Sequence, residues 1–419
     1  MTNHLVLRLA TAVVMAGGAV TALAGTAPAE AAPAACNAPD AAIYTPPSSV
    51  SGPPGTLLAC EQVTLPEVPG NIPMKAWKVQ YVSTNVLGAK IAVSGTVAVP
   101  DAAWTGPGPR PVIAFNPGTL GLGPQCAFSK QLAGAFQDEY EGNNIAAILN
   151  AGYAVAATDG VGYLNGEVHT YVVGKNAGHA LLDAARTALQ VPGAGLSPTA
   201  KVGIWGYSEG GQASLWAAQL AASYAPDLHV AGAAAGGIPG DLKVVAASLN
   251  GGPFAGFLAD AVIGLHSAYP DMPFTSLLNS TGTAAVSQAE SLCVAGTVAA
   301  FAGAHIENYT TNHLTLDQIY ALHGPDGTWG KIVNSQKLGV GLGTTYPIGF
   351  PVFQYRGLAD EVIPASTENA THEAYCAAGV TTQWNTYPGD HILADGEAIS
   401  DVISWFGDRF ASKPTAGNC

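Results

Sequence analysis

The stretch Lys201-Val-Gly-Ile-Trp-Gly-Tyr-Ser-Glu-Gly-Gly-Gln-Ala-Ser214 decides the fold. A short apolar run leads into a glycine-rich turn, and a sequence of helical character follows. At the turn, Gly206-Tyr-Ser208-Glu-Gly210 is a G-x-S-x-G pentapeptide. Strand, turn and helix in this order are typical of a nucleophile elbow, which holds a serine in a strained backbone conformation. The alternative is an ordinary glycine-rich turn with a solvated serine, since 51 of the 419 residues are glycine. The flanking strand and helix favour the elbow.

Composition indicates a compact globular protein. Hydrophobic residues make up 48% of the chain and charged residues 11%, which excludes a disordered chain. The formal net charge of −14 argues against nucleic acid as a partner and against electrostatic docking on anionic lipid. The length suits one large core with an insertion, or two domains.

The N-terminus has the pattern of a signal peptide. Arg8 precedes an uncharged apolar run over 9–24, and Ala29-Glu30-Ala31 fits a small-residue cleavage site. We expect cleavage of residues 1–31 and secretion, to the medium or the cell wall. The alternative is a membrane anchor, but the run is short and is interrupted by Gly17-Gly18. No later run is long enough to span a bilayer, so we expect no integral membrane segment in the mature chain.

Six cysteines remain after that cleavage. An even number in an exported chain predicts three disulfides, and sequence alone leaves fifteen pairings open. No C-x-x-C spacing occurs, so we expect no metal or redox site. The six are Cys36, Cys60, Cys126, Cys293, Cys376 and Cys419.

Strand-like and helix-like segments alternate through most of the chain. This rhythm predicts an α/β fold with a mostly parallel sheet flanked by helices. The strand before Ser208 is the fifth of the series, and the first two strands form a hairpin. The predicted strands are 75–82, 90–99, 111–116, 153–158, 201–207, 229–235, 350–355 and 381–387, and the clearest helices are 177–190, 212–224 and 394–411.

This alternation of strand-like and helix-like segments divides the chain into several parts. Residues 32–72 are rich in Pro, Ala, Gly and Ser, and we expect an irregular N-terminal arm there. Residues 73–240 and 345–419 carry the strands of the core. Between them, residues 241–344 show only Ala- and Leu-rich helical pieces. We interpret these residues as an inserted helical cap, because a structureless loop of that length is improbable.

A serine nucleophile needs a base within hydrogen-bond reach, and the base needs an acid to orient it. In α/β-hydrolases the chain order is Ser, then Asp or Glu, then His. Asp360 and His391 each follow one of the last two predicted strands, in that order. We therefore predict a catalytic triad of Ser208, Asp360 and His391. The alternative for His391 is a surface loop histidine.

Three other acidic residues lie near the predicted acid and base. Asp390 adjoins His391, and neighbours in sequence rarely point at each other. We expect Asp395 to cap the last helix. We expect Glu361 to be solvated or to pair with Arg356.

The oxyanion formed on an ester carbonyl needs backbone N–H donors. One should be the N–H of Glu209, which follows the nucleophile, and the other should come from the loop after the third strand. That loop is Asn116-Pro-Gly-Thr119, and because proline has no N–H we choose Thr119. The alternative is a plain Pro-Gly turn. We interpret Asp159, at a strand end, as a helix or turn cap.

These motifs together resemble the secretory lipases, the α/β-hydrolase family typified by Candida antarctica lipase A, from about Trp77 to Cys419. One departure is Asn116-Pro117-Gly118, where members often have His-Gly-Thr, and it bears on the oxyanion donors. The motifs are Asn116-Pro-Gly-Thr119 with Cys126, Thr158-Asp-Gly-Val-Gly162, Gly206-Tyr-Ser-Glu-Gly-Gly211, Gly236-Gly-Ile-Pro-Gly-Asp-Leu242, Gly357-Leu-Ala-Asp360-Glu-Val-Ile-Pro364 and Gly389-Asp-His391.

The resemblance carries implications for the site. It implies the triad of Ser208, Asp360 and His391, a helical cap over the active site, and ester substrates that include acylglycerols, without metal or cofactor. It also implies three disulfides, which are Cys36–Cys60, Cys126–Cys293 and Cys376–Cys419.

Residues and resemblance together predict a secreted serine ester hydrolase, a lipase that cleaves esters such as triacylglycerols, at a lipid–water interface or in solution. The alternatives are an acyltransferase with the same triad and a non-catalytic lipid- or cell-wall-binding protein. No acidic pair that would suit an aminopeptidase is evident. Oligomeric state stays open. Candidate substrate-binding residues, which can equally form the core of the cap, are Tyr207, Phe254, Phe257, Leu258 and Phe301.

Overall fold

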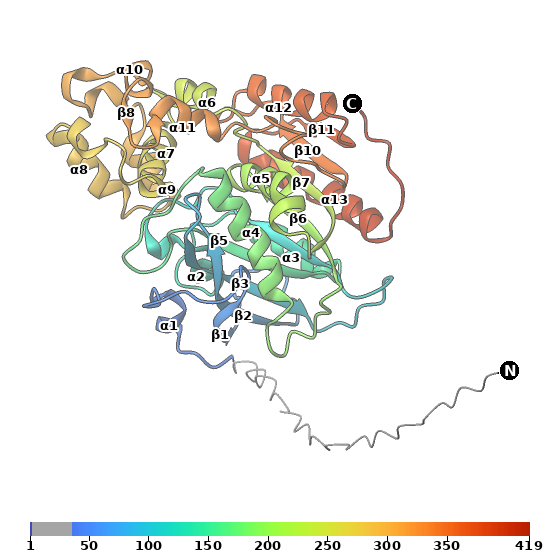
Figure 1. Ribbon diagram of the computed structural model, residues 1–419. Coiled ribbons are helices and arrows are strands. Elements are labelled where there is room, and N and C mark those ends of the chain that lie inside the picture. The colour runs from blue at the N-terminus through green and yellow to red at the C-terminus, as the bar shows by residue number, and fades with distance from the viewer. Residues whose placement is uncertain (2–35) are drawn as a thin grey trace. The chain divides into compact units, whose positions relative to one another are not determined.

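A nine-stranded sheet forms the centre of the protein. The computed structural model describes Met1 and residues 36–419. The predicted signal peptide, residues 1–31, lies outside the described residues apart from Met1. The strand order is β1-β2-β3-β5-β4-β6-β7-β10-β11 (Figure 1). The strands are β1 (Leu57–Val63), β2 (Met74–Thr84), β3 (Lys90–Pro100), β4 (Val112–Asn116), β5 (Ala154–Gly160), β6 (Lys201–Tyr207), β7 (His229–Gly236), β10 (Val352–Gly357) and β11 (Thr382–Tyr387).

The sheet is antiparallel at one edge and parallel through the rest. Strands β1, β2, β3 and β5 pair antiparallel in that order. From β5 onward every pair is parallel. All residues of β4 and β5 are buried, as expected for parallel strands covered on both faces. The predicted mostly parallel sheet is confirmed, and so is the β2–β3 hairpin.

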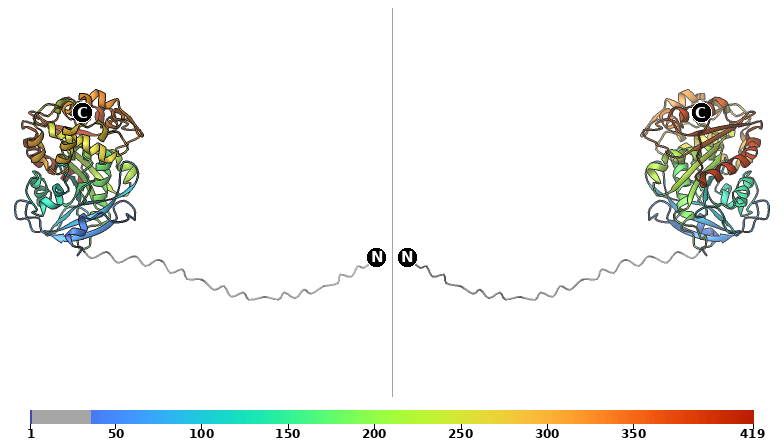
Figure 2. Two further views of the ribbon diagram at one scale, coloured as in Figure 1. Left: turned by 90° about the vertical axis from the view of Figure 1, so that its left-hand side faces the viewer. Right: turned by 90° about the vertical axis from the view of Figure 1, so that its right-hand side faces the viewer.

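Helices cover both faces of the sheet (Figure 2). Helices α4, α5 and α12 share one apolar core with the sheet, whereas α2, α3 and α13 share another. The helices of the core are α1 (Asp40–Tyr44), α2 (Phe128–Leu132), α3 (Gly142–Asn150), α4 (Gly174–Ala188), α5 (Glu209–Tyr224), α12 (Ala365–Ala377) and α13 (His391–Phe410).

Helix α13 shows how the sequence pattern produces the packing. Ala398, Val402 and Phe406 are fully buried at a spacing of four residues, so they lie on one face of the helix. The helix begins at His391, three residues before the predicted start, because the side chain of Asp390 caps it by accepting the N–H of Leu393 at 2.9 Å. The cap expected at Asp395 was therefore wrong. Asp395 is buried in the second turn.

The N-terminal arm is more regular than predicted. Residues 57–63 form β1, an edge strand that pairs with β2, and Cys36 is bonded to Cys60 in this strand. The expectation of an irregular arm was wrong over β1, because pairing with a neighbouring strand overrides weak local preference. Ser208 therefore follows the sixth strand of the chain rather than the fifth.

Residues 241–344, which we call the cap region, contain no strand of the large sheet. They contain mainly short helices, gathered beyond one end of the sheet in Figure 1. The cap elements are α6 (Leu242–Leu249), α7 (Ala255–Ala268), η2 (Thr275–Leu277), α8 (Ser280–Ala289), α9 (Val294–Phe301), η3 (Ile306–Asn308), η4 (Thr311–His313), α10 (Leu316–Tyr320), the two-residue strands β8 (His323–Gly324) and β9 (Gly327–Thr328), and α11 (Trp329–Ser335).

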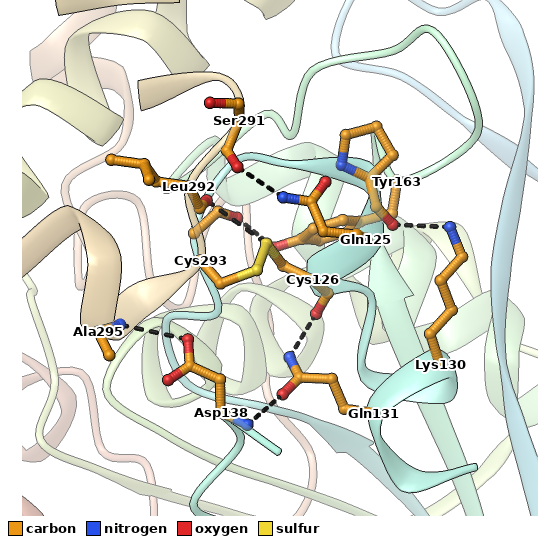
Figure 3. The surroundings of a disulfide bond; sticks show 12 residues. Gln125, Cys126, Lys130, Gln131, Asp138, Tyr163, Ser291, Leu292, Cys293 and Ala295 are labelled. Carbon is orange, nitrogen blue, oxygen red and sulfur yellow. Dashed lines mark hydrogen bonds between the residues drawn. A yellow bond between two sulfur atoms is a disulfide. The ribbon is translucent and has the colours of Figure 1, made fainter. Parts of the chain in front are cut away.

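A disulfide joins the cap region to the core. Cys126, at the end of η1 (Pro124–Cys126), is bonded to Cys293, which immediately precedes α9. Around the bond, the N–H of Leu122 donates to the carbonyl of Leu292 at 3.2 Å. The side chain of Gln125 donates to the carbonyl of Ser291 at 2.6 Å (Figure 3). The third pair is Cys376–Cys419. These are the three pairs that the family resemblance implies.

Candidate active site

Ser208 lies on a sharp turn between β6 and α5. Its backbone has φ 57° and ψ −119°, a region that non-glycine residues adopt only under strain. The N–H of Ser208 donates to the carbonyl of Gly236 at 2.9 Å. A Cβ atom on Gly206 or Gly210 would lie 2.5 or 2.0 Å from the carbonyl oxygen of Asn116. The turn therefore requires glycine at both positions, as an elbow does.

The three residues of the predicted triad lie in contact. Nε2 of His391 is 2.9 Å from Oγ of Ser208, and Nδ1 of His391 is 2.7 Å from Oδ2 of Asp360. Ser208 and His391 are buried, and the side chain of Asp360 is only 1% exposed. A carboxylate accepts, so Nδ1 carries the proton and Nε2 is left to accept from the serine hydroxyl. The arrangement suits proton transfer from Ser208 to His391.

Backbone groups hold the acid in place. Oδ1 of Asp360 accepts the N–H groups of Val362 and Ile363 at 2.9 and 2.8 Å, which leaves Oδ2 for the imidazole. Oε2 of Glu361 accepts the backbone N–H of His391 at 3.1 Å. Glu361 is exposed, as one of the two expectations had it, and it does not pair with Arg356. It accepts this bond because the loop after β10 lies against the first turn of α13.

The two predicted oxyanion donors lie at the start of α5 and in the loop after β4. Glu209 is the first residue of α5, where N–H groups have no acceptor within the helix. In the loop after β4, the N–H of Gly118 donates to the carboxylate of Glu141 at 2.5 Å, and Pro117 has no N–H. Among the described residues the N–H of Thr119 has no acceptor. Thr119 is therefore the donor that this loop keeps available.

Two buried acids, Glu141 and Asp395, lie behind the triad, and the sequence assigned no role to Glu141 and only a helix cap to Asp395. Burial raises the pKa of Glu141 well above its ordinary value, and the nearby Asp395 adds to the effect. Burial also raises the pKa of Asp395 to about 6, although Asn144 donates to its Oδ1 at 3.1 Å. Asp395 lies one helical turn after His391. No sequence signal joins residues so far apart in the chain.

Two apolar cavities lie beside Ser208 and in the cap region. A cavity of about 40 Å³ is lined by Ser208, and one of about 130 Å³ lies among the cap helices. The two cavities have four lining residues in common. Both linings are mainly hydrophobic, as in sites for apolar ligands. The shared residues, from α6 and α7, are Leu242, Ala246, Leu258 and Ala261.

Three of the five predicted substrate-binding residues line a cavity, and two do not. Leu258 lines both cavities, Phe257 the smaller and Phe301 the larger. Tyr207 and Phe254 line neither. The ring of Tyr207 packs against His391 and Tyr355, at 5.1 and 5.7 Å between ring centroids, and Phe254 stacks on Phe257 at 6.0 Å. The two cavities therefore lend no support to substrate binding by Tyr207 and Phe254, whose rings pack against other aromatic side chains.

Comparison with known proteins places the chain in a family. Residues 127–418 match the model of the family described as secretory lipase. The chain belongs to the secretory lipase family. This secretory lipase family member is similar to Lipase 10 of Candida albicans, with 29% identity over 282 residues that cover 66% of this chain and 59% of that protein.

Two further relatives of this secretory lipase family member extend the match. A Mycobacterium tuberculosis protein named "Probable inactive lipase MT1628" is 30% identical over 371 residues, which cover 86% of this chain and 79% of that one. The closed-state crystal structure of Candida antarctica lipase A matches with a TM-score of 0.75 and 25% identity, over 90% of this chain and 88% of that one. The chain spans about 59% of the length of the Candida albicans lipase that it matches.

No group of three or more His, Cys, Asp or Glu side chains within residues 36–419 is placed to hold a metal ion. In the same residues, no helix has both the length and the apolar character needed to cross a bilayer.

Proposed function

We propose that this chain is a carboxylic ester hydrolase that works through an acyl-enzyme on Ser208. The observation that carries the proposal is the position of the His391 imidazole, 2.9 Å from Oγ of Ser208 and 2.7 Å from the carboxylate of Asp360. The strained elbow and the two unoccupied backbone donors add support, because a buried serine in an ordinary turn needs neither.

The proposed reaction has two halves. In the first, Oγ of Ser208 attacks the ester carbonyl carbon while Nε2 of His391 takes the hydroxyl proton. The carbon–oxygen bond to the alcohol then breaks, and His391 gives the proton to the leaving alcohol oxygen. In the second, water loses a proton to His391 and attacks the acyl carbon. Ser208 leaves with that proton, and the products are one carboxylic acid and one alcohol.

The acid and the backbone donors supply electrostatic stabilisation. Asp360 holds the imidazole in the reactive tautomer and stabilises its cationic form. In both halves the carbonyl oxygen becomes an oxyanion. We assign the N–H groups of Thr119 and Glu209 to it, and the loss of one such donor commonly costs a factor of about 10² to 10³ in kcat.

The two cavities support an acyl substrate with an apolar chain. The acyl group would begin in the 40 Å³ cavity at Ser208 and extend toward the 130 Å³ cavity past Leu258 and Ala261. An enzyme that uses both cavities prefers medium or long chains and is a lipase. A preference for acetate or butyrate esters alone would make it an esterase of small substrates.

We further propose that the chain is secreted after cleavage of residues 1–31. The three disulfides support an oxidising destination. N-terminal sequencing of the protein recovered from the culture medium tests this proposal. A start near residue 32 is expected, and an intact N-terminus in secreted protein would contradict the cleavage.

The decisive experiment compares two serine variants on a series of p-nitrophenyl esters from acetate to palmitate. Ser208→Ala should lose at least about a thousandfold in kcat, because the nucleophile is gone. Ser214→Ala is the matched control on the same helix. Its buried hydroxyl has no hydrogen-bond partner among the described residues, so activity should stay near wild type. Full activity in Ser208→Ala would refute the mechanism and favour a non-catalytic binding protein. That alternative is worth testing because one relative is named a probable inactive lipase.

A further inference from the structure

A second histidine–carboxylate pair lies beside the nucleophile. The carboxylate of Glu209, the residue after Ser208, lies with its Oε1 2.6 Å from Nε2 of His169. Both side chains are about 94% buried. The other ring nitrogen of His169, Nδ1, is 2.9 Å from the carbonyl oxygen of Val161. A carbonyl only accepts, so Nδ1 carries a proton and the ring is held at both ends.

The same segment also holds the opposite side of the predicted oxyanion site. The ring of His169 stacks on Tyr163 at 4.4 Å between centroids, and the hydroxyl of Tyr163 donates to the carbonyl of Gly121 at 2.6 Å. The hydroxyl of Tyr171 is 2.9 Å from Oγ1 of Thr119. Residues 161–171, which we call the brace segment, thus contact the elbow through Glu209 and the loop after β4 through Thr119 and Gly121.

The brace segment is closed on itself as well. The carbonyl of Val161, which accepts from Nδ1 of His169, also accepts the backbone N–H of Thr170 at 2.9 Å. Tyr163, His169 and Tyr171 of the brace segment are buried and make hydrogen bonds to both loops. We therefore expect the brace segment to fix the separation of the two loops. The N–H groups of Thr119 and Glu209 must converge on one oxygen atom, and an error of about 1 Å in such a placement costs about a hundredfold in rate.

We propose that His169 and Glu209 are positioning residues, and that the brace segment sets the spacing of the two oxyanion donors. This inference rests on the proposed ester hydrolysis at Ser208. In this arrangement the side chain of Glu209 does no chemistry on the substrate. Its bond to His169 fixes the direction of its own backbone N–H, which does contact the oxyanion.

A neighbouring acid provides a matched control. Asp260 of α7 is fully buried, and neither of its carboxyl oxygens has a hydrogen-bond partner among the described residues. Burial, with the charge of Glu209 as a second cause, raises the pKa of Asp260 well above its ordinary value. Asp260→Asn keeps the shape of the side chain and removes no hydrogen bond of the brace segment.

The test measures kcat, KM and inhibition by phenylboronic acid, whose tetrahedral adduct on a serine places an oxygen in the oxyanion site. Glu209→Ala should lower kcat about ten- to a hundredfold and weaken inhibition by phenylboronic acid by a similar factor. Its KM should stay within about threefold of the wild-type value. Glu209→Gln retains a partner for Nε2 of His169 and should recover most of that loss. His169→Ala should match Glu209→Ala, and the double variant should lose no more than either. Asp260→Asn should leave all three quantities unchanged.

Two outcomes overturn the proposal. One is a Glu209→Ala enzyme with wild-type kcat and wild-type boronic acid affinity. The other is a loss that appears in KM alone. If Glu209→Ala does not fold, Tyr163→Phe tests the same brace by the loss of one hydroxyl. A severalfold drop in kcat at unchanged KM supports the brace, and an unchanged kcat refutes it. Activity retained in Ser208→Ala would instead refute the underlying reaction.

Discussion

The carboxylate of Asp360 lies 2.7 Å from Nδ1 of His391, although 31 residues and a whole helix separate them in the chain. Each follows one of two adjacent parallel strands, β10 and β11, whose carboxyl ends lie side by side at the same end of the strands. Ser208 follows the carboxyl end of β6, on the same side of the sheet. The chemistry therefore depends on strand pairing, and each residue can be tested separately.

The first prediction concerns the acid. Asp360→Asn should lower kcat by about 10³ to 10⁴, because an amide beside Nδ1 favours the wrong tautomer of His391. The measurement is steady-state hydrolysis of p-nitrophenyl butyrate. Glu361→Gln is the control, because its side-chain oxygen still accepts the backbone N–H of His391. A loss as large in Glu361→Gln would show that loop structure rather than the tautomer is responsible.

The second prediction concerns the pH dependence of stability. Burial raises the pKa of Asp395 from 3.8 to about 6, so the folded chain binds this proton more tightly than the unfolded chain does. The contribution to stability is therefore fully present below pH 4 and is lost as the pH rises through 6. Asp395→Asn should raise the free energy of unfolding at pH 8 by at most about 3 kcal/mol, and the gain should vanish below pH 4.

Urea denaturation at pH 4, 6 and 8 measures this effect. Asp408→Asn on the same helix is the control, since its carboxylate is exposed and pairs with Lys413 at 2.7 Å. That variant should show no gain at pH 8. A gain for Asp395→Asn that is independent of pH would attribute the effect to packing instead of ionisation.

The third prediction concerns the disulfide between core and cap region. Replacing Cys126 and Cys293 with serine opens a loop of 167 residues and should lower the free energy of unfolding by about 2 to 5 kcal/mol. Replacing Cys376 and Cys419 opens a loop of 43 residues, so the expected loss is smaller by about 1 kcal/mol. Guanidinium denaturation of the two double variants gives the comparison. A larger loss of unfolding free energy from the shorter loop would mean that contacts around the disulfide in the folded protein, rather than loop length, set its contribution.

The fourth prediction concerns acyl-chain length. Ala285 of α8 lines the larger cavity, so Ala285→Phe should fill part of it. We expect kcat/KM for p-nitrophenyl palmitate to fall about tenfold or more, with a much smaller change for the acetate ester, because only a long acyl chain needs that space. Ala284→Phe, on the exposed side of the same helix, should leave both substrates unaffected. Equal losses on the two esters would place the acyl chain elsewhere.

Much of the core was predictable because local patterns and tertiary contacts agree there. The predicted strands are present because parallel strands buried on both faces are continuous apolar runs. Strand β1 was missed because only Cys60 of its seven residues is buried, and its pairing with β2 stabilises it more than its own sequence does. The last helix began earlier than predicted because Asp390, rather than Asp395, caps it.

The triad was predictable for a different reason. Chain order and strand ends select Ser208, Asp360 and His391 without any knowledge of distances. The groups around the triad follow no such rule. Glu141 meets Gly118, and His169 meets Glu209, only because separate loops converge at one edge of the sheet. Tyr207 and Phe254 were assigned to the substrate on residue type alone, and packing uses both.

The sequence by itself determined the fold class, the elbow and the identity of the three side chains of the proposed triad, because hydrophobic period and strand–turn–helix order are local properties. Only the tertiary structure decided which N–H groups have no acceptor, which buried acids have a raised pKa and where the apolar cavities lie. Those properties depend on what burial brings together from distant parts of the chain. The brace segment is an example, since the role that we propose for His169 depends on its contact with Glu209.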